Sequence, residues 1–144
     1  MELLIGKGVG QLRFGMTQDE VSALLGEANL KFIDEDDETQ LLWEYTDLKI
    51  RLSFYLAEGG KLGYIRSSNQ NLILYGSSVI DSRIENLKDL IEPDQDLWEI
   101  DKYFLFDQYF MEQNWVLLNV EYERVTDIEL GVPIGKDDEY LWPN

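Results

Sequence analysis

Between Leu48 and Leu56 apolar and polar residues alternate without a break, and this pattern constrains the fold more than any other in the chain. Only a β-strand places successive side chains on opposite faces, so the pattern predicts a strand with one buried and one solvated face. The following Glu-Gly-Gly-Lys segment, residues 58–61, predicts a hairpin turn, and residues 62–67 predict the returning strand. The sequence therefore predicts an antiparallel sheet.

Four further stretches have the residue types of strands. They are residues 71–75, 103–110, 116–122 and 125–130. Aromatic residues occupy both faces of the stretch 103–110. A strand in a two-layer domain has one buried face, so some of these rings are expected to be exposed.

Two short helices are predicted, each ahead of a group of strands. Thr17 and Glu20 have the spacing of a capping box, in which each side chain bonds the other's backbone amide. Ser82 and Glu85 have the same spacing at the start of a second apolar stripe, which predicts a helix over about 82–91.

The order helix, strands, helix, strands suggests a tandem duplication. The tripeptide Leu-Trp-Glu at 42–44 recurs at 97–99, and Ile73 and Gly76 recur at the same offset as Ile128 and Gly131. The predicted helices, which begin near Thr17 and Ser82, are further apart than this offset. The difference calls for an insertion in the first helix-to-strand loop, which holds the acidic run 34–38. Repeat one is expected over about 8–76 and repeat two over about 77–135.

These elements predict an α+β fold, in which two short helices pack on one face of an antiparallel sheet. A chain of 144 residues with 44% hydrophobic residues is long and apolar enough to bury a core. No segment has the composition of a linker, so one domain is expected over residues 1–144.

The chain contains no cysteine and no histidine. This absence excludes disulfides, thiol nucleophiles, histidine acid–base catalysis and the usual zinc sites. Close carboxylate pairs carry little information, because 29 acidic residues produce such pairs by chance. We therefore expect a binding protein, with no enzyme activity and no cofactor.

Twelve basic residues against 29 acidic ones give a formal charge of −17. Such a charge repels phosphate backbones and anionic lipids, so nucleic acid and membrane are not expected as partners, whereas a basic protein surface is. Acidity that serves solubility alone is the other interpretation. The chain shows no export signal and no apolar run of bilayer length, so a cytoplasmic location is expected.

The acidic residues concentrate in two stretches, one of which is the run 34–38. This run could be a calcium or magnesium site, a docking patch or a solvated loop. It lacks the alternation and central glycine of a calcium loop, which disfavours the metal. The second stretch follows the second predicted helix. If the repeats lie side by side, both stretches are expected to emerge at one edge of the sheet and to form one acidic face.

Aromatic residues beside these acids have two interpretations, core packing or an interface with aromatic anchors. The candidate partner-binding residues are Asp34, Glu35, Asp36, Asp37, Glu38, Trp43, Asp94, Asp96, Trp98, Glu99, Asp101 and Tyr109.

The segment from Phe14 to Gly26 contains Gly-Met-Thr, then Val21, then Leu-Gly. It resembles the signature of the SmpA/OmlA (BamE-like) and beta-lactamase inhibitory protein group, and the match covers residues 8–26. The resemblance implies a helix followed by antiparallel strands, duplicated in the inhibitory proteins.

Without an export signal or a lipidated cysteine, the chain looks like a cytoplasmic version of that unit, similar to the immunity proteins of polymorphic toxins. This resemblance implies an inhibitor that neutralises a cognate toxin, with a basic nuclease domain as the expected target. A non-catalytic BamE-like scaffolding module is the alternative.

Overall fold

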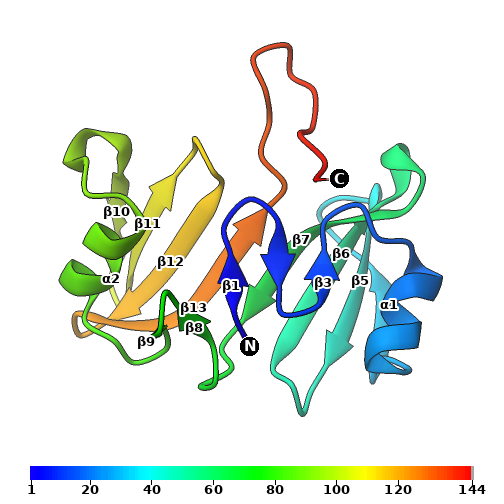
Figure 1. Ribbon diagram of the computed structural model, residues 1–144, viewed down its shortest axis with the longest axis horizontal. Helices are drawn as coiled ribbons and strands as arrows, with labels where there is room; N and C mark the ends of the chain where they lie inside the picture. The colour runs from blue at the N-terminus through cyan, green and yellow to red at the C-terminus, as the bar shows by residue number, and fades with distance from the viewer. Residues whose placement is uncertain (144) are drawn as a thin grey trace.

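The computed structural model describes residues 1–143 and is built around an antiparallel sheet of eight strands (Figure 1). The first four in the chain are β4 (Leu30–Ile33), β5 (Gln40–Tyr45), β6 (Ile50–Tyr55) and β7 (Lys61–Ser67). The other four are β10 (Glu99–Lys102), β11 (Asp107–Met111), β12 (Val116–Glu121) and β13 (Arg124–Gly131). The expected α+β class with an antiparallel sheet is confirmed.

The two groups of strands meet through their last members. The order across the sheet is β10-β11-β12-β13-β7-β6-β5-β4, so β13 pairs with β7 at the centre. In that pair Leu130 lies opposite Ile65, and Ile128 lies opposite Ser67. The first strand of each group, β4 or β10, is consequently an outer strand.

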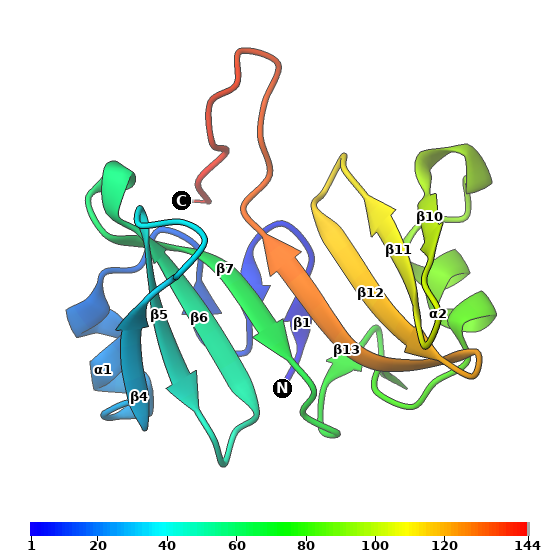
Figure 2. The same cartoon turned by 180° about the vertical axis from the view of Figure 1, so that it is seen from behind.

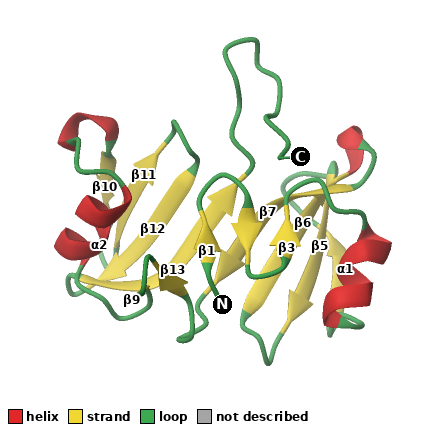
Figure 3. Cartoon of the chain, viewed as in Figure 1, coloured by secondary structure: helices red, strands yellow, loops and turns green. Residues whose placement is uncertain are grey.

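Helices α1 (Gln18–Leu25) and α2 (Ile84–Ile91) lie on one face of the sheet, near its opposite ends (Figure 3). Figure 2, seen from behind, shows the other face without a helix. We call this helix-free side the open face; Arg51, Tyr64, Arg66, Asn119 and Asp127 lie on it. No helix among residues 1–143 is long and apolar enough to cross a membrane.

The capping box of α1 is confirmed and that of α2 is wrong. Glu20 N donates to Thr17 Oγ1 at 3.2 Å, and Thr17 N donates to Glu20 Oε1 at 3.1 Å. At α2 the residue before the helix is Arg83, which makes no side-chain cap. The Ser82 hydroxyl instead donates to Val79 O at 2.6 Å, because the preceding turn brings that carbonyl within its reach.

Short strands cover the centre of the helical face. β1 (Leu3–Leu4), β2 (Gly8–Val9) and β3 (Leu12–Arg13) form a three-stranded sheet, and β8 (Ile73–Leu74) pairs with β9 (Ser77–Ser78). Their apolar side chains join one buried cluster with residues of both helices and both strand groups. Two 3-10 turns, η1 (Leu56–Glu58) and η2 (Gln95–Leu97), complete the elements.

The period-two prediction for β6 is confirmed by burial. Ile50, Leu52 and Phe54 point into the core, whereas Arg51 is exposed on the open face. Strand β12 buries Val116, Leu118 and Val120 in the same alternation, whereas a bulge in the β12–β13 pair interrupts it on β13.

The strand predicted over 103–110 is wrong in its first half. Residues 103–106 form the turn between β10 and β11, closed by a hydrogen bond from Tyr103 N to Phe106 O of 2.9 Å. Tyrosine and phenylalanine favour strands intrinsically, and here tertiary pairing overrides that preference.

The same order of a helix followed by four strands occurs twice, but not at the expected spacing. Helices α1 and α2 begin at Gln18 and Ile84, and strands β6 and β12 begin at Ile50 and Val116, so both pairs share one offset. The Leu-Trp-Glu match predicted a shorter offset than the one between the helices, and this prediction is wrong. Its two tryptophans do not occupy equivalent elements, since Trp43 lies in β5 whereas Trp98 precedes β10. The longer helix-to-strand connection is the second one, from α2 to β10, not the first.

Gly63 in β7 makes one stability prediction. A Cβ there would lie 2.3 Å from the nearest ring atom of Tyr55, a ring that Tyr140 and Trp142 hold in place. We expect Gly63→Ala to lower the free energy of unfolding by about 2 kcal/mol, since an overpacked core must shift its neighbours. Urea unfolding measures this loss. The loss caused by Gly63→Ala should be smaller in a Tyr55→Leu protein, which lacks the ring. An equal loss in the Tyr55→Leu protein and the wild type would contradict the steric cause.

Candidate protein-binding surface

The β10–β11 hairpin carries one of the two most exposed large apolar side chains of residues 1–143. Phe104 is 97% exposed, Leu105 71% and Tyr103 52%. Tyr122, in the neighbouring β12–β13 turn, is 97% exposed and borders the same surface hollow as the hairpin. We call Tyr103, Phe104, Leu105, Phe106 and Tyr122 the aromatic tip.

The hairpin turn fixes the shape of the aromatic tip. The rings of Tyr103 and Phe106 stack with their centroids 4.8 Å apart and their planes at 20°. This stack closes the base of the turn and leaves Phe104 and Leu105 at its end. Burying one such side chain stabilises a contact by roughly 1.5–3 kcal/mol, so this patch is a candidate binding surface.

Acidic residues flank the aromatic tip. Lys102 Nζ lies 3.5 Å from an Asp107 carboxylate oxygen, and an Arg83 guanidinium nitrogen lies 3.3 Å from Glu123. Glu121 is exposed and forms no ion pair within residues 1–143. Two of these acids are thus paired with a cation, and Glu121 is the acid beside the tip that has no such partner within residues 1–143.

The acidic run Asp34–Glu38 connects β4 to β5, and two of its members stabilise the turn. Asp34 accepts from Asp36 N at 2.9 Å, and Asp37 accepts from Thr39 N at 3.0 Å. The hydrogen bonds from Thr39 lower the pKa of Asp37 below its ordinary value. Across residues 1–143 no three acidic side chains are grouped so that they could hold a metal ion.

The second acidic stretch lies at the opposite edge of the sheet. Asp94 and Asp96 are exposed in and beside η2, and Glu99 and Asp101 are exposed on β10. Since β4 and β10 are the two outer strands, the prediction that both stretches emerge at one edge is wrong. The cause is the central β13–β7 pairing, which turns the first strand of each group outward.

The two tryptophans predicted as anchors are core residues. Trp43 is 3% exposed and packs against Phe54 with ring centroids 4.7 Å apart, and Trp98 is 6% exposed. Trp98 Nε1 donates to Glu92 O at 2.9 Å, so its polar atom is satisfied inside. Tyr109 is half-buried against the core.

The prediction that part of the stretch 103–110 exposes its rings is confirmed. The pattern on both faces of that stretch was the available signal for Tyr103, Phe104 and Phe106. Nothing in the sequence pattern singled out Leu105. The strand predicted over 116–122 is wrong at its end, since β12 stops at Glu121 and Tyr122 lies exposed in the following turn.

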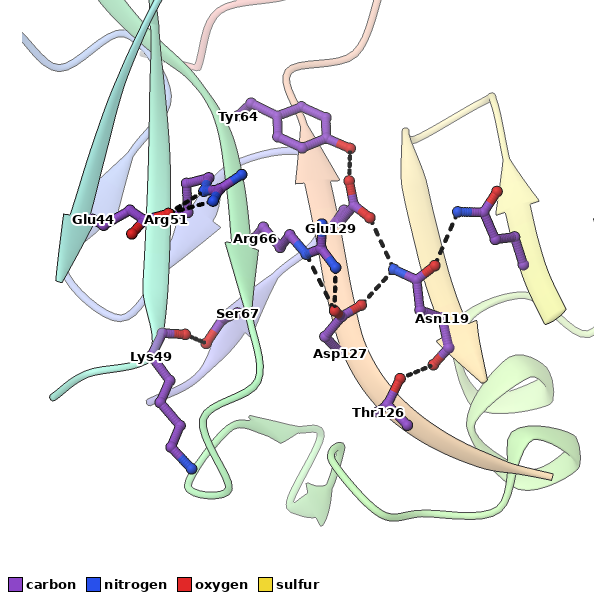
Figure 4. Close-up of polar contacts among 11 residues, drawn as sticks. Glu44, Lys49, Arg51, Tyr64, Arg66, Ser67, Asn119, Thr126, Asp127 and Glu129 are labelled. Atoms are coloured by element: carbon purple, nitrogen blue, oxygen red, sulfur yellow. Dashed lines mark hydrogen bonds and ion pairs between the residues drawn. The ribbon is translucent and has the colours of Figure 1, made fainter. Parts of the chain in front are cut away.

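A polar network lies on the open face where the two groups of strands meet (Figure 4). Arg66 on β7 donates to Asp127 on β13 through Nε at 3.1 Å and a terminal nitrogen at 2.7 Å. Tyr64 on β7 donates to Glu129 on β13. The Asn119 amide on β12 donates to both carboxylates. Burial and the adjacent Glu129 raise the pKa of Tyr64.

A groove of about 540 Å³ beside this network is lined by Arg51 and Arg66. Arg51 Nε donates to Glu44 at 2.8 Å, and Arg66 is bonded to Asp127. Both guanidinium charges are therefore compensated within the sheet. This makes the groove a weaker candidate than the aromatic tip.

Comparison with known proteins informs the fold alone. No protein-family model matches the chain, and no curated protein matches it in sequence. Among solved structures it is similar to an extracellular protein containing a SCP domain from Bacillus anthracis str. Ames, with a TM-score of 0.54 and 15% identity. The match covers 80% of this chain and 42% of that one, so this chain spans less than half of the neighbour's length.

Proposed function

We propose that this chain is a non-catalytic inhibitor of the immunity-protein type, which binds a toxin domain through its aromatic tip. The observation that carries the proposal is the near-complete exposure of Phe104 and Tyr122, with Leu105 beside them, on adjoining turns. A protruding apolar patch of this kind contributes binding energy when a partner's pocket encloses it.

The charge of −17 supports a basic partner. The aromatic tip follows β10 directly, so it shares an edge with Glu99 and Asp101, whereas Asp34–Glu38 lies at the other edge. Of the second acidic stretch, Asp101 lies nearest the tip, because Asp94 and Asp96 precede the other end of β10. The remaining acids, with the first stretch, would act at a distance by steering. A nuclease domain with a phosphate-binding cleft offers the matching basic rim.

A BamE-like scaffolding module is the second candidate, and the apolar outer strand β4 favours it. Leu30, Phe32 and Ile33 are all exposed on that strand. The affinity of a scaffold that pairs through a sheet edge should change little with salt concentration. The affinity of an inhibitor that is attracted to its partner by charge should fall steeply as salt is added.

A tandem duplication is part of the proposal. The two halves share the order of a helix and four antiparallel strands, and the offset from Gln18 to Ile84 equals the offset from Ile50 to Val116. An alignment of related sequences at that offset would test it, and a random match between the halves would count against it.

The first experiment is a pull-down from the source organism at low and moderate salt, with bound proteins identified by mass spectrometry. One small basic partner that is released by salt and encoded beside this protein would support the inhibitor. Recovery of envelope-assembly proteins, independent of salt, would favour the scaffold.

With that partner in hand, Phe104→Ser is expected to weaken binding by at least about 30-fold, the effect of losing an interface hot spot. Isothermal titration calorimetry measures the change. Tyr75→Ser is the matched control, since Tyr75 is a 70% exposed aromatic residue between β8 and β9. Equal affinity of Phe104→Ser and the wild type would remove the aromatic tip from the interface.

A further inference from the structure

The two outer strands of the main sheet differ in chemistry. β10 is charged at three of its four positions, namely Glu99, Asp101 and Lys102. Charges of this kind protect a sheet edge from pairing with other strands. β4 is apolar at three of its four positions, with Leu30 54%, Phe32 38% and Ile33 47% exposed.

The backbone of β4 has unpaired groups that point away from the sheet. Asp34 N donates to Gln40 O at 3.0 Å, and Phe32 lies opposite Leu42 in the ladder. In an antiparallel pair, residues bonded to the neighbouring strand alternate with residues whose N–H and C=O point outward. Phe32 is therefore bonded to β5, and the amides of Lys31 and Ile33 face solvent.

We propose that β4 is a docking edge that takes an extended peptide segment of a basic protein as a ninth strand. The main-chain groups of Lys31 and Ile33 would supply the ladder bonds, and Leu30 and Phe32 would pack on its apolar side chains. The exposed acids Glu35, Asp36 and Glu38, directly after β4, select lysine or arginine in that segment.

Charge argues against a second copy of this chain as the occupant. Each copy carries −17, and antiparallel pairing of β4 with itself would bring Asp34–Glu38 of one copy near Glu27 of the other. A basic segment meets the same surface with attraction instead of repulsion.

The test uses a fluorescent peptide, about eight residues long, that alternates lysine and valine. Amide hydrogen exchange of the wild-type protein is expected to slow at least about tenfold at Lys31 and Ile33 when the peptide is added. Ile33→Pro removes an outward N–H without removing a bond to β5, and is expected to weaken peptide binding at least about tenfold.

Ile100→Pro in β10 is the matched control. Ile100 is 45% exposed, and the bond from Tyr103 N to Phe106 O places its N–H outward by the same alternation. Both variants keep the net charge. If the peptide were held by attraction between charges alone, both variants would bind it with the affinity of the wild type. Binding by Phe104→Ser should persist, which separates this edge from the aromatic tip.

Three results would overturn the proposal. One is unchanged exchange at Lys31 and Ile33 when peptide fluorescence shows saturation. Another is equal affinity for Ile33→Pro and Ile100→Pro. The third is slower exchange of the same amides when the protein concentration is raised without peptide, together with a dimer in analytical ultracentrifugation. That result would mean that a second copy of this chain occupies the edge.

Discussion

Asn119→Leu is expected to lower the free energy of unfolding by about 3 kcal/mol, because two carboxylates on the same face of β13 would lose their shared donor. Asn119 is 7% exposed, and its amide donates to Asp127 and Glu129, the latter at 2.8 Å. Leucine has the same number of side-chain heavy atoms, branched at the same carbon, but no donor. Asp127 keeps its bonds from Arg66 and Glu129 keeps its bond from Tyr64, so the expected loss is that of two hydrogen bonds to charged acceptors, which are stronger than bonds to neutral ones.

Thr126→Val is the comparison for that experiment. The Thr126 hydroxyl donates to Asn119 O at 3.2 Å, so this variant removes one neutral hydrogen bond at the same place. Its cost should be about 1 kcal/mol or less. Urea unfolding followed by far-ultraviolet circular dichroism measures both, and an equal loss in the two variants would mean that the network adds little stability.

Local signals in the sequence predicted the elements whose cause is local. The Thr17–Glu20 capping box needs four consecutive residues, and the alternation over Leu48–Leu56 needs only a strand's own periodicity. The capping box is confirmed, and the alternation is confirmed over β6, whereas Leu48 lies in the preceding turn and Leu56 begins η1. The Ser82 capping box is wrong because a nearby carbonyl, Val79 O, competed for the hydroxyl, which residue types alone do not reveal.

Sheet order could not be read from the sequence, and the candidate site depends on it. The pairing of β13 with β7 joins residues such as Ile65 and Leu130, far apart in the chain. That pairing places the acidic stretches at opposite edges and leaves the β10–β11 turn exposed at one of them. The burial of Trp43 is equally non-local, since it depends on Phe54 of the neighbouring strand.

High pH is expected to destabilise the protein through tyrosines whose folded-state pKa is raised, less so at Tyr45 and most at Tyr64 and Tyr55. Burial is the main cause for both, followed by the charge of Glu129 at Tyr64 and by Tyr140 at Tyr55. In the unfolded chain a tyrosine ionises with a pKa of about 10. The stabilisation is therefore complete below about pH 10 and is lost as the pH rises toward the folded-state values, because only the unfolded chain releases the protons.

Tyr64 and Tyr55 each contribute up to about 1.4 kcal/mol per pH unit above about pH 10, so the pair would remove roughly 4 kcal/mol by about pH 11.5. Urea unfolding at several values from about pH 8 to about pH 11.5 gives the slope. Tyr64→Phe should halve it, although the lost bond to Glu129 makes that variant less stable at neutral pH. If the slope were the same in Tyr64→Phe as in the wild type, the Tyr64 phenol would ionise as freely in the folded chain as in the unfolded one. The stability of the β7–β13 junction would then not depend on the protonation of Tyr64.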